Sequence, residues 1–290
     1  MNKIGIMQGR LTKPLHRTDI QFPIYNDKEI VKEFETAKDI GLDYIEWNIC
    51  KGVPNLFLGD LDAQQEIKSL IEQFVSIDSI CLDYLMNIKD IQNKTDLTHY
   101  IDIVNWISNM ASNIGCNLLI IPIHEKNMDF LILNHLTSIA LERFKLKVAF
   151  EFLDVNSYTG INFINDMNYS NKLSFMNFKK IGCCFDIGNN CQKLGTNGRV
   201  NLSHDNIIKE MENYNKYNML YHIHIKEKNT LGKSVELGKG VIGEDGWSRI
   251  FKFLKKINYT GNFTLQVTRG KDGKELETVK KQMEFIKELM

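Results

Sequence analysis

The sequence predicts an α/β protein built as a single closed (β/α)₈ barrel over residues 1–290. Short apolar runs alternate with longer amphipathic segments from end to end. Eight strands that are each followed by a helix are the pattern of this barrel, and 290 residues suffice for one. A doubly wound sheet is the weaker alternative, because no Gly-x-Gly-x-x-Gly motif follows the first expected strand. We therefore expect one domain without an internal boundary.

The eight expected strands are short runs rich in β-branched and aromatic residues. They cover residues 3–7, 43–49, 79–85, 117–124, 147–153, 181–187, 220–225 and 262–267. Helix-like stretches lie between them, for example at residues 27–41, 62–76 and 95–115. Gly41, Gly115 and Gly182 follow the last apolar residue of such stretches, where a glycine commonly ends a helix.

The charge balance restricts the partners of the protein. Its 36 basic and 36 acidic residues leave no excess of Lys and Arg for a nucleic-acid surface. No apolar run approaches the roughly 20 residues of a membrane span, and the first apolar stretch is too short for a signal peptide. The six cysteines lack zinc-type spacing, which predicts buried free thiols in a reducing compartment. We expect a cytoplasmic protein that binds neither nucleic acid nor membrane.

Polar residues occur near the carboxyl end of nearly every expected strand, which is where barrel enzymes place their active sites. Buried parallel strands are otherwise continuous apolar runs, so these residues call for a functional explanation. They are Gln8, Arg10, Glu46, Asp83, His124, Glu151, Asp186, His222, His224, Gln266 and Arg269.

Two of these residues, His222 and His224, lie two positions apart and share one face of the seventh strand. His224 is nearer the carboxyl end, and His222 lies about 6–7 Å deeper at the rise of a β-strand. Glu151 and Asp186 are expected at equivalent depths on the fifth and sixth strands. These positions predict that His224 binds a metal together with them, whereas His222 is a hydrogen-bonded histidine of the interior.

The chain also resembles a known family, through six stretches that are spread over its full length in the family's order. They are IGIMQGRL, GLDYIEWNI, VAFEFLD, CFDIGNN, HIHIKEK followed by GKGVIGEDGW, and INYTGNFTLQVTRG. The resemblance is to the xylose-isomerase-like barrels of sugar and sugar-phosphate isomerases and epimerases, a superfamily that also includes endonuclease IV. The likeness is greatest to the branch with the L-ribulose-5-phosphate 3-epimerases and to relatives that begin with the same MQGRL.

The resemblance implies a divalent metal held by a Glu, an Asp, a His and a second Glu from the last four strands. The first three match Glu151, Asp186 and His224, whereas the fourth falls on Gln266. An amide is not a base, although its carbonyl oxygen still binds a hard cation. Mn²⁺ is the expected ion, with Co²⁺, Mg²⁺ and Zn²⁺ as alternatives, and it would polarise a substrate carbonyl and stabilise an enediolate. Glu151 is the expected base.

The remaining polar residues are assigned by their positions. Lys226 shares the face of His224 and is, with Glu151 and His124, an expected catalytic residue; a solvated lysine at the barrel mouth is the alternative. The expected substrate-binding residues are Gln8, Arg10, Glu46, Asp83 and Arg269.

A glycine-rich segment, LGKGVIGEDGW at residues 237–247, follows the seventh strand. Barrels often bind phosphate through backbone N–H groups in this region, which makes the segment a candidate phosphate loop. The alternative is that Asp245 simply caps the helix that begins there.

These assignments predict a metal-dependent isomerase or epimerase that acts on a small sugar or sugar phosphate through an enediolate. The alternatives are a metal-dependent lyase that dehydrates a polyol or keto acid, and a sugar- or metal-binding barrel without turnover, since Gln266 replaces the second Glu. Gln266 also favours isomerisation over epimerisation, unless Glu227, Asp83 or His124 supplies the second acid–base group. An endonuclease is disfavoured, because its additional metal ligands and basic surface are not visible in the sequence. Barrels of this kind often pair, so a homodimer is one expected assembly.

Overall fold

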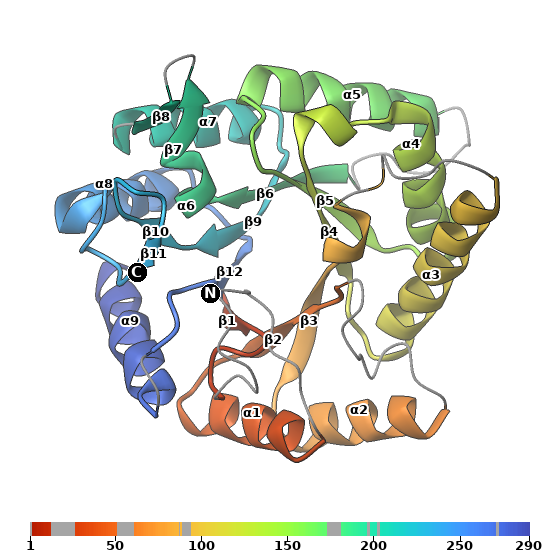
Figure 1. The fold of residues 1–290 in the computed structure, drawn as a ribbon, viewed down its shortest axis with the longest axis horizontal. Helices are drawn as coiled ribbons and strands as arrows, with labels where there is room; N and C mark the ends of the chain where they lie inside the picture. Colours follow the sequence, from red (N-terminus) through yellow and green to blue (C-terminus); the bar gives the residue numbers. More distant parts are fainter. Residues whose placement is uncertain are drawn as a thin grey trace.

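The protein folds into a closed barrel of parallel strands in the computed structural model, which describes residues 2–12, 27–50, 61–86, 88, 94–172, 181–195, 198–201, 204–270 and 273–290. The barrel strands are β1 (Ile4–Met7), β2 (Tyr44–Asn48), β3 (Ser76–Cys81), β4 (Leu118–Ile123), β5 (Lys147–Phe152), β6 (Ile181–Asp186), β9 (Leu220–Ile225) and β12 (Asn262–Leu265). Strand β1 pairs with both β2 and β12, which closes the barrel (Figure 1). The predicted (β/α)₈ barrel is confirmed.

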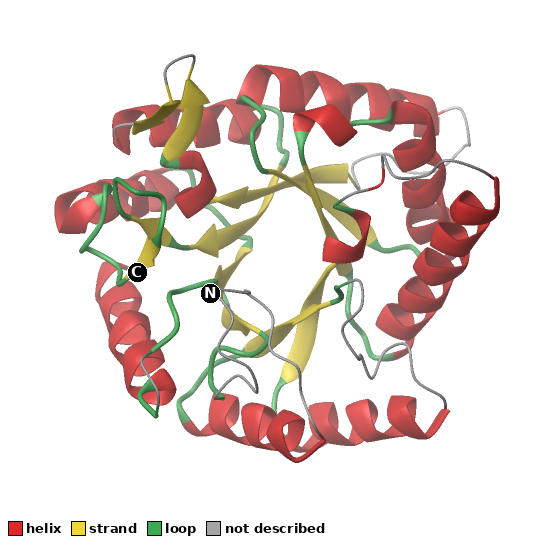
Figure 2. Ribbon diagram, viewed as in Figure 1, coloured by secondary structure: helices red, strands yellow, loops and turns green. Residues whose placement is uncertain are grey.

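Helices surround the barrel strands on the outside (Figure 2). They are α1 (Asp27–Asp39), α2 (Leu61–Gln73), α3 (Lys94–Asn113), α4 (Phe130–Ser138) with a π-helical extension (Ile139–Arg143), α5 (Ser157–Lys172), α7 (His204–Lys216), α8 (Gly243–Lys256) and α9 (Glu275–Leu289). Their apolar faces pack against the strands, and the side chains of Phe34 on α1 and Trp247 on α8 are fully buried.

Short insertions follow two of the strands at their carboxyl ends. Strand β6 leads into the helical turn α6 (Ile187–Asn190) and the hairpin β7 (Gln192–Gly195) and β8 (Gly198–Asn201). Strand β9 leads into the hairpin β10 (Glu227–Lys228) and β11 (Ser234–Val235). Both insertions begin where the candidate site residues lie.

Two local predictions were wrong. The third strand runs from Ser76 to Cys81 and not over residues 79–85 as predicted. Its first residues alternate between polar and apolar, and in the sequence this pattern merges with the end of the preceding amphipathic helix. Gly182 lies inside β6, where a Cβ atom would approach the Tyr221 ring to 2.6 Å. Gly41 and Gly115 do end helical segments, with φ of +75° and +77°.

The barrel interior contains both an apolar cluster and buried polar groups. The apolar cluster consists of Cys81, Leu118, Ile120, Ala149 and Cys184. The fully buried polar side chains include Glu46, Ser79, His222, His224 and Thr264. Buried polar groups must pair with one another, and their pairing builds the site described below.

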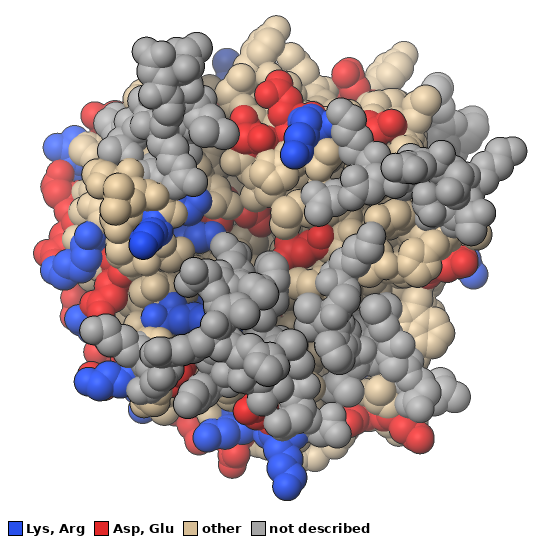
Figure 3. All heavy atoms as spheres, in the orientation of Figure 1, with Lys and Arg blue, Asp and Glu red and all other residues tan. Residues whose placement is uncertain are grey.

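The remaining chain-wide predictions concern cysteines, membranes and charge. All six cysteines are buried free thiols, as predicted. Within the described ranges, no helix combines the length and hydropathy needed to cross a membrane. On the face shown in Figure 3, Lys and Arg side chains lie among Asp and Glu side chains.

Candidate active site

Glu46, on β2, joins two histidines of β9 inside the barrel. Its Oε1 lies 2.8 Å from His224 Nε2, and its Oε2 lies 3.1 Å from His222 Nε2. The hydroxyls of Ser79 and Thr264 donate to Oε2 at 2.7 and 3.0 Å. Burial opposes ionisation of Glu46, but the imidazoles of His224 and His222 outweigh it and hold the pKa of Glu46 well below its ordinary value. The oxygens predicted to bind substrate therefore already face four protein groups.

His222 has a fixed hydrogen-bonding partner, in keeping with an interior histidine. Its Nε2 lies 2.7 Å from Thr264 Oγ1, and that hydroxyl lies 2.8 Å from the Tyr44 hydroxyl. Burial lowers the pKa of His222, so the ring is neutral at pH 7. The chain of contacts from Tyr44 through Thr264 and His222 to Glu46 fixes the inner part of the site.

His224 lies between two carboxylates. Its Nε2 faces Glu46, and its Nδ1 lies 3.3 Å from Glu151 Oε2. Both contacts are close in distance but lack the alignment of a hydrogen bond. Burial lowers the pKa of His224, but the neighbouring Cys184, Glu46 and Glu151 outweigh it and raise that pKa well above its ordinary value. Glu46 and Glu151, on either side of the ring, both favour its protonated form.

The turn after β6 fixes the carboxylates of Glu151 and Asp186. Asp186 caps α6, because its Oδ1 accepts the Asn189 backbone N–H at 2.7 Å. The Asn189 side chain donates to Glu151 Oε1 at 2.9 Å and accepts from Lys228 Nζ at 2.7 Å. Sequence reasoning did not name Asn189, although an Asp followed three residues later by an Asn is the signal of such a capped turn.

The strand registers offset Glu151 from Asp186. Glu151 pairs with Cys184 across β5 and β6, whereas Asp186 pairs with His224 across β6 and β9. Glu151 and Asp186 therefore differ by two residues in strand register. A register shift between Cys183 and Cys184 further displaces β6 against β9.

Lys226 is buried beside Asp186 and Gln266, with only 3% of its surface exposed. Its Nζ donates to Gln266 Oε1 at 3.0 Å and lies 3.7 Å from Asp186 Oδ2. The Gln266 Nε2 atom lies 3.4 Å from Met7 Sδ, which orients the amide with its oxygen toward the lysine. The alternative of a solvated lysine at the barrel mouth is wrong.

Asp83 begins a 3₁₀ turn (Asp83–Leu85) just beyond the end of β3, and is therefore not on the strand as predicted. Asn48 Nδ2 donates to its Oδ2 at 3.0 Å. Burial raises the pKa of Asp83 to about 7, against the opposing effect of the Asn48 hydrogen bond, and the nearby charge of Glu151 adds to the rise. A half-buried carboxyl group with a pKa near neutrality is suited to proton transfer.

The hydrogen-bonding partners of His124 and Gln8 are Asp154 and Asn48. His124 directly follows β4, its Nδ1 lies 3.0 Å from Asp154 Oδ2, and its side chain is 34% exposed. The Gln8 side-chain oxygen accepts the Asn48 backbone N–H at 3.0 Å. The structure thus places His124 at an exposed position and Gln8 in a bond between two neighbouring strands.

The loop after β1, with Arg10, is anchored from α1. Glu33 Oε1 accepts the backbone N–H groups of Gly9 and Arg10 at 2.6 and 3.1 Å, and its Oε2 accepts the Thr12 hydroxyl at 2.8 Å. Arg269 donates to the Gly9 carbonyl oxygen. Sequence reasoning missed Glu33, because it lies among the charged residues of an ordinary amphipathic helix.

Glu227 accepts five N–H donors from the glycine-rich segment. The donors are the backbone N–H groups of Gly238, Gly240, Ile242 and Gly243 and the indole N–H of Trp247. The prediction that these backbone groups bind phosphate is wrong, because they bind a protein carboxylate. Asp245 does not cap α8 either, since it pairs with Arg249 at 3.1 Å. Glu227 is consequently not available as a second acid–base group.

The predicted metal ligands do not form a four-ligand set. Among the described residues, the groups whose ligand atoms lie within 4.8 Å of one another are Glu46 with His222 and His224, and Glu151 with Cys184 and His224. These are potential metal-binding residues, and burial raises the pKa of the Cys184 thiol to about 12. Asp186 belongs to neither group, and the oxygen of Gln266 accepts the Lys226 ammonium. Of the four predicted ligands, Glu151 and His224 therefore lie together as expected, whereas Asp186 and Gln266 are engaged by Lys226.

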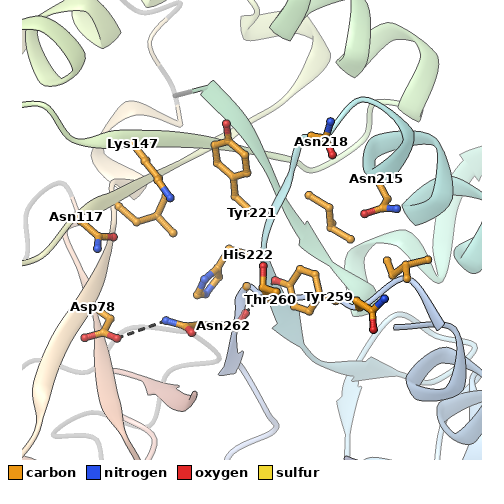
Figure 4. Close-up of a pocket in the computed structure, with 15 residues that line it drawn as sticks. Asp78, Asn117, Lys147, Asn215, Asn218, Tyr221, His222, Tyr259, Thr260 and Asn262 are labelled. Atoms are coloured by element: carbon orange, nitrogen blue, oxygen red, sulfur yellow. Dashed lines mark hydrogen bonds between the residues drawn. The ribbon is translucent and has the colours of Figure 1, made fainter. Parts of the chain in front are cut away.

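A separate cavity of about 490 Å³ opens at the amino-terminal ends of the strands. Its lining includes Asn117, Lys147, Tyr221 and Asn262, and Figure 4 shows the last of these bonded to Asp78. Barrel enzymes use the opposite end of the barrel for chemistry. The cavity lies at the opposite end from the expected chemistry, and it reaches the inner part of the candidate site at His222, which is one of its lining residues.

The fold and the site together define a (β/α)₈ barrel with carboxylates, an imidazole and a lysine gathered in its interior and at the carboxyl ends of its strands. The chain belongs to the xylose isomerase-like TIM barrel family, whose family model matches residues 34–289. No curated protein matches the sequence.

Similar solved structures cover nearly the whole chain. A xylose isomerase-like TIM barrel protein from Mycobacterium smegmatis in complex with magnesium is 14% identical, with a TM-score of 0.68 over 99% of this chain and 96% of that one. A D-allulose 3-epimerase from Methylomonas sp. is 14% identical, with a TM-score of 0.66 over 100% and 98%. An L-ribulose 3-epimerase is 13% identical, with a TM-score of 0.69 over 100% and 94%. At these identities the likeness establishes the fold.

Proposed function

We propose that the protein is a sugar isomerase or epimerase that transfers a proton at a carbon next to a carbonyl group. The observation that carries the proposal is the buried Glu151 carboxylate, whose Oε1 is fixed by Asn189 while its Oε2 faces His224. Membership of the xylose isomerase-like family supports this chemistry. The similar folds of a D-allulose and an L-ribulose epimerase support a small sugar as the substrate class.

The chemistry of the site residues suggests the order of proton transfers. Glu151 accepts the proton from the substrate carbon, and negative charge develops on the carbonyl oxygen of the resulting enediolate. The buried ammonium of Lys226 stabilises that charge. In an isomerisation, the Glu151 carboxyl group returns the proton to the former carbonyl carbon on the same face of the sugar, while the hydroxyl proton of the reacting carbon passes to the former carbonyl oxygen.

An epimerisation needs a second acid–base group on the other face of the enediolate. Gln266 is an amide, and Glu227 is saturated by N–H donors of its own loop. His124 is paired with Asp154 at an exposed position. Asp83, with its pKa near 7, is the remaining group of those proposed from the sequence. Isomerisation is thus the simpler reaction for this site, and epimerisation would use Asp83.

The predicted Mn²⁺ has no part in these steps, because the side-chain oxygen of Gln266, the fourth expected metal ligand, accepts a hydrogen bond from Lys226. The engaged backbone N–H groups of the glycine-rich segment favour an unphosphorylated sugar over a sugar phosphate. The single domain, the homodimer and the cytoplasmic location stay predictions.

The test is a proton-exchange screen by nuclear magnetic resonance in deuterated water, with small aldoses, ketoses and their phosphates as substrates. Glu151→Gln should lower the exchange rate by about 10²–10⁴-fold, the usual contribution of a general base. Glu244→Gln, at an exposed position paired with Lys239, serves as the matched control and should leave the rate unchanged. Dehydration of a polyol or keto acid in the same screen would indicate the lyase instead, and binding of a sugar without exchange would indicate a barrel without turnover.

A further inference from the structure

We infer that Lys226 is a built-in cation of the active site, which takes the place of a divalent metal ion between Asp186 and Gln266. Lys226 lies two residues beyond His224, directly after the end of β9, and the side chains of both residues reach carboxylates of the site. Its Nζ lies 3.0 Å from Gln266 Oε1 and 3.7 Å from Asp186 Oδ2. These oxygens belong to two of the four residues expected to ligate a metal.

The lysine is held in this position by its surroundings and not only by its charge. Its side chain is 3% exposed. A Cβ atom at Gly188 would approach the Lys226 Cγ and Cβ atoms to 2.6 and 2.8 Å, so the glycine of the DIGNN turn leaves room for the lysine stem. The packing around the stem therefore sets the direction in which the ammonium points.

The amide at position 266 suits an ammonium better than a divalent ion. A neutral amide oxygen accepts one N–H of Lys226, and Gln266 Nε2 is directed toward Met7 Sδ. Asp186 then balances the single charge of the ammonium. A divalent ion in the same place would be repelled by the ammonium at short range and would lack one carboxylate. Lys226 and Gln266 thus form a matched pair.

This inference deepens the proposed function, on which it rests for the role of the ammonium in catalysis. Removal of the substrate proton by Glu151 sends the electron pair of the C–H bond toward the carbonyl oxygen. An ammonium has three N–H donors, and one of them is engaged by Gln266. The donors that remain can bind the oxygen as its charge develops, which is the task that a metal ion performs in a metal-dependent isomerase.

The experiment measures metal binding and therefore does not depend on knowing the substrate. Purified protein is treated with a chelator, dialysed and titrated with Mn²⁺, Mg²⁺ and Zn²⁺ by calorimetry, and its metal content is measured by mass spectrometry. The wild type is expected to hold well under one ion per chain. The double variant Lys226→Met with Gln266→Glu is expected to bind one ion at least about tenfold more tightly, the scale seen when groups around a metal site are changed.

Two single variants and a control separate the outcomes. Gln266→Glu alone should gain no metal, because the new carboxylate pairs with Lys226, and Lys239→Met, at an exposed site, should match the wild type. One ion per chain in the wild type, lost in Asp186→Asn, would overturn the inference, and so would metal binding gained by Gln266→Glu alone. The wild-type measurement stands even where a variant fails to fold. Protein that exchanges no sugar proton either with or without added Mn²⁺ would leave the cation assignment standing and reject the proposed function.

Discussion

Replacing Glu227 by Gln should destabilise the protein strongly, although the two side chains have nearly the same shape. Glu227 is fully buried, and its Oε1 accepts hydrogen bonds from three backbone N–H groups. Its Oε2 accepts hydrogen bonds from the backbone N–H of Gly238 and the indole N–H of Trp247. A glutamine retains one oxygen and turns the other into an N–H₂ group. Even in the better orientation, two buried donors then face a donor.

An unsatisfied buried donor costs about 1–3 kcal/mol, so the change should lower the free energy of unfolding by about 2–6 kcal/mol. Urea unfolding followed by circular dichroism measures this difference. Glu244→Gln, on the exposed surface of the same loop-to-helix region, should leave the unfolding midpoint unchanged. If Glu227→Gln unfolds at the same urea concentration as the wild type, the carboxylate does not organise the glycine-rich segment, and the argument that its amides are unavailable to phosphate is refuted.

Two further predictions concern groups beside the site. Asp83→Asn should change the pH dependence of stability: the pKa of Asp83 is raised to about 7, so its stabilising contribution is present below the unfolded value of 3.8 and is lost as the pH rises toward 7. The variant should therefore gain stability relative to the wild type as the pH rises from about 4 to about 7. Urea unfolding at pH 4 and at pH 7 measures this gain, with the exposed Asp245→Asn as control. A difference in unfolding free energy between variant and wild type that is the same at both pH values would show that the pKa of Asp83 is not raised. Gly188→Ala should lower the free energy of unfolding by about 1–3 kcal/mol through overpacking against Lys226, and an unchanged melting curve would show that the lysine stem is not confined there.

The sequence was sufficient to predict the barrel, because each strand and helix carries its own periodicity. The limits of β3 were harder to place, since Ser76 and Asp78 interrupt its apolar pattern at the partly exposed end of the strand. The interior role of His222 was predictable from its position along the strand, and the structure gives it the hydrogen-bonded neighbours expected of an interior residue.

The contacts of the site were less accessible from the sequence. Glu33 anchors the loop after β1, and Glu227 anchors the segment before α8; both bonds join residues whose proximity depends on loop conformation. The two-residue offset between Glu151 and Asp186 comes from strand register, which the barrel sets as a whole. The pairing of Lys226 with Gln266 could not be derived from either strand by itself, although the missing carboxylate at position 266 was visible as a departure from the family.

The most direct test of the central claim is solvent deuterium incorporation into a small sugar by chelator-treated protein. In the proposed mechanism, Glu151 transfers the proton while Lys226 stabilises the developing oxygen charge, without a divalent ion. This mechanism predicts that deuterium enters the substrate next to its carbonyl group at the same rate before and after chelation, and that Glu151→Gln abolishes the incorporation. Incorporation that stops after chelation and returns on addition of Mn²⁺ would contradict the account.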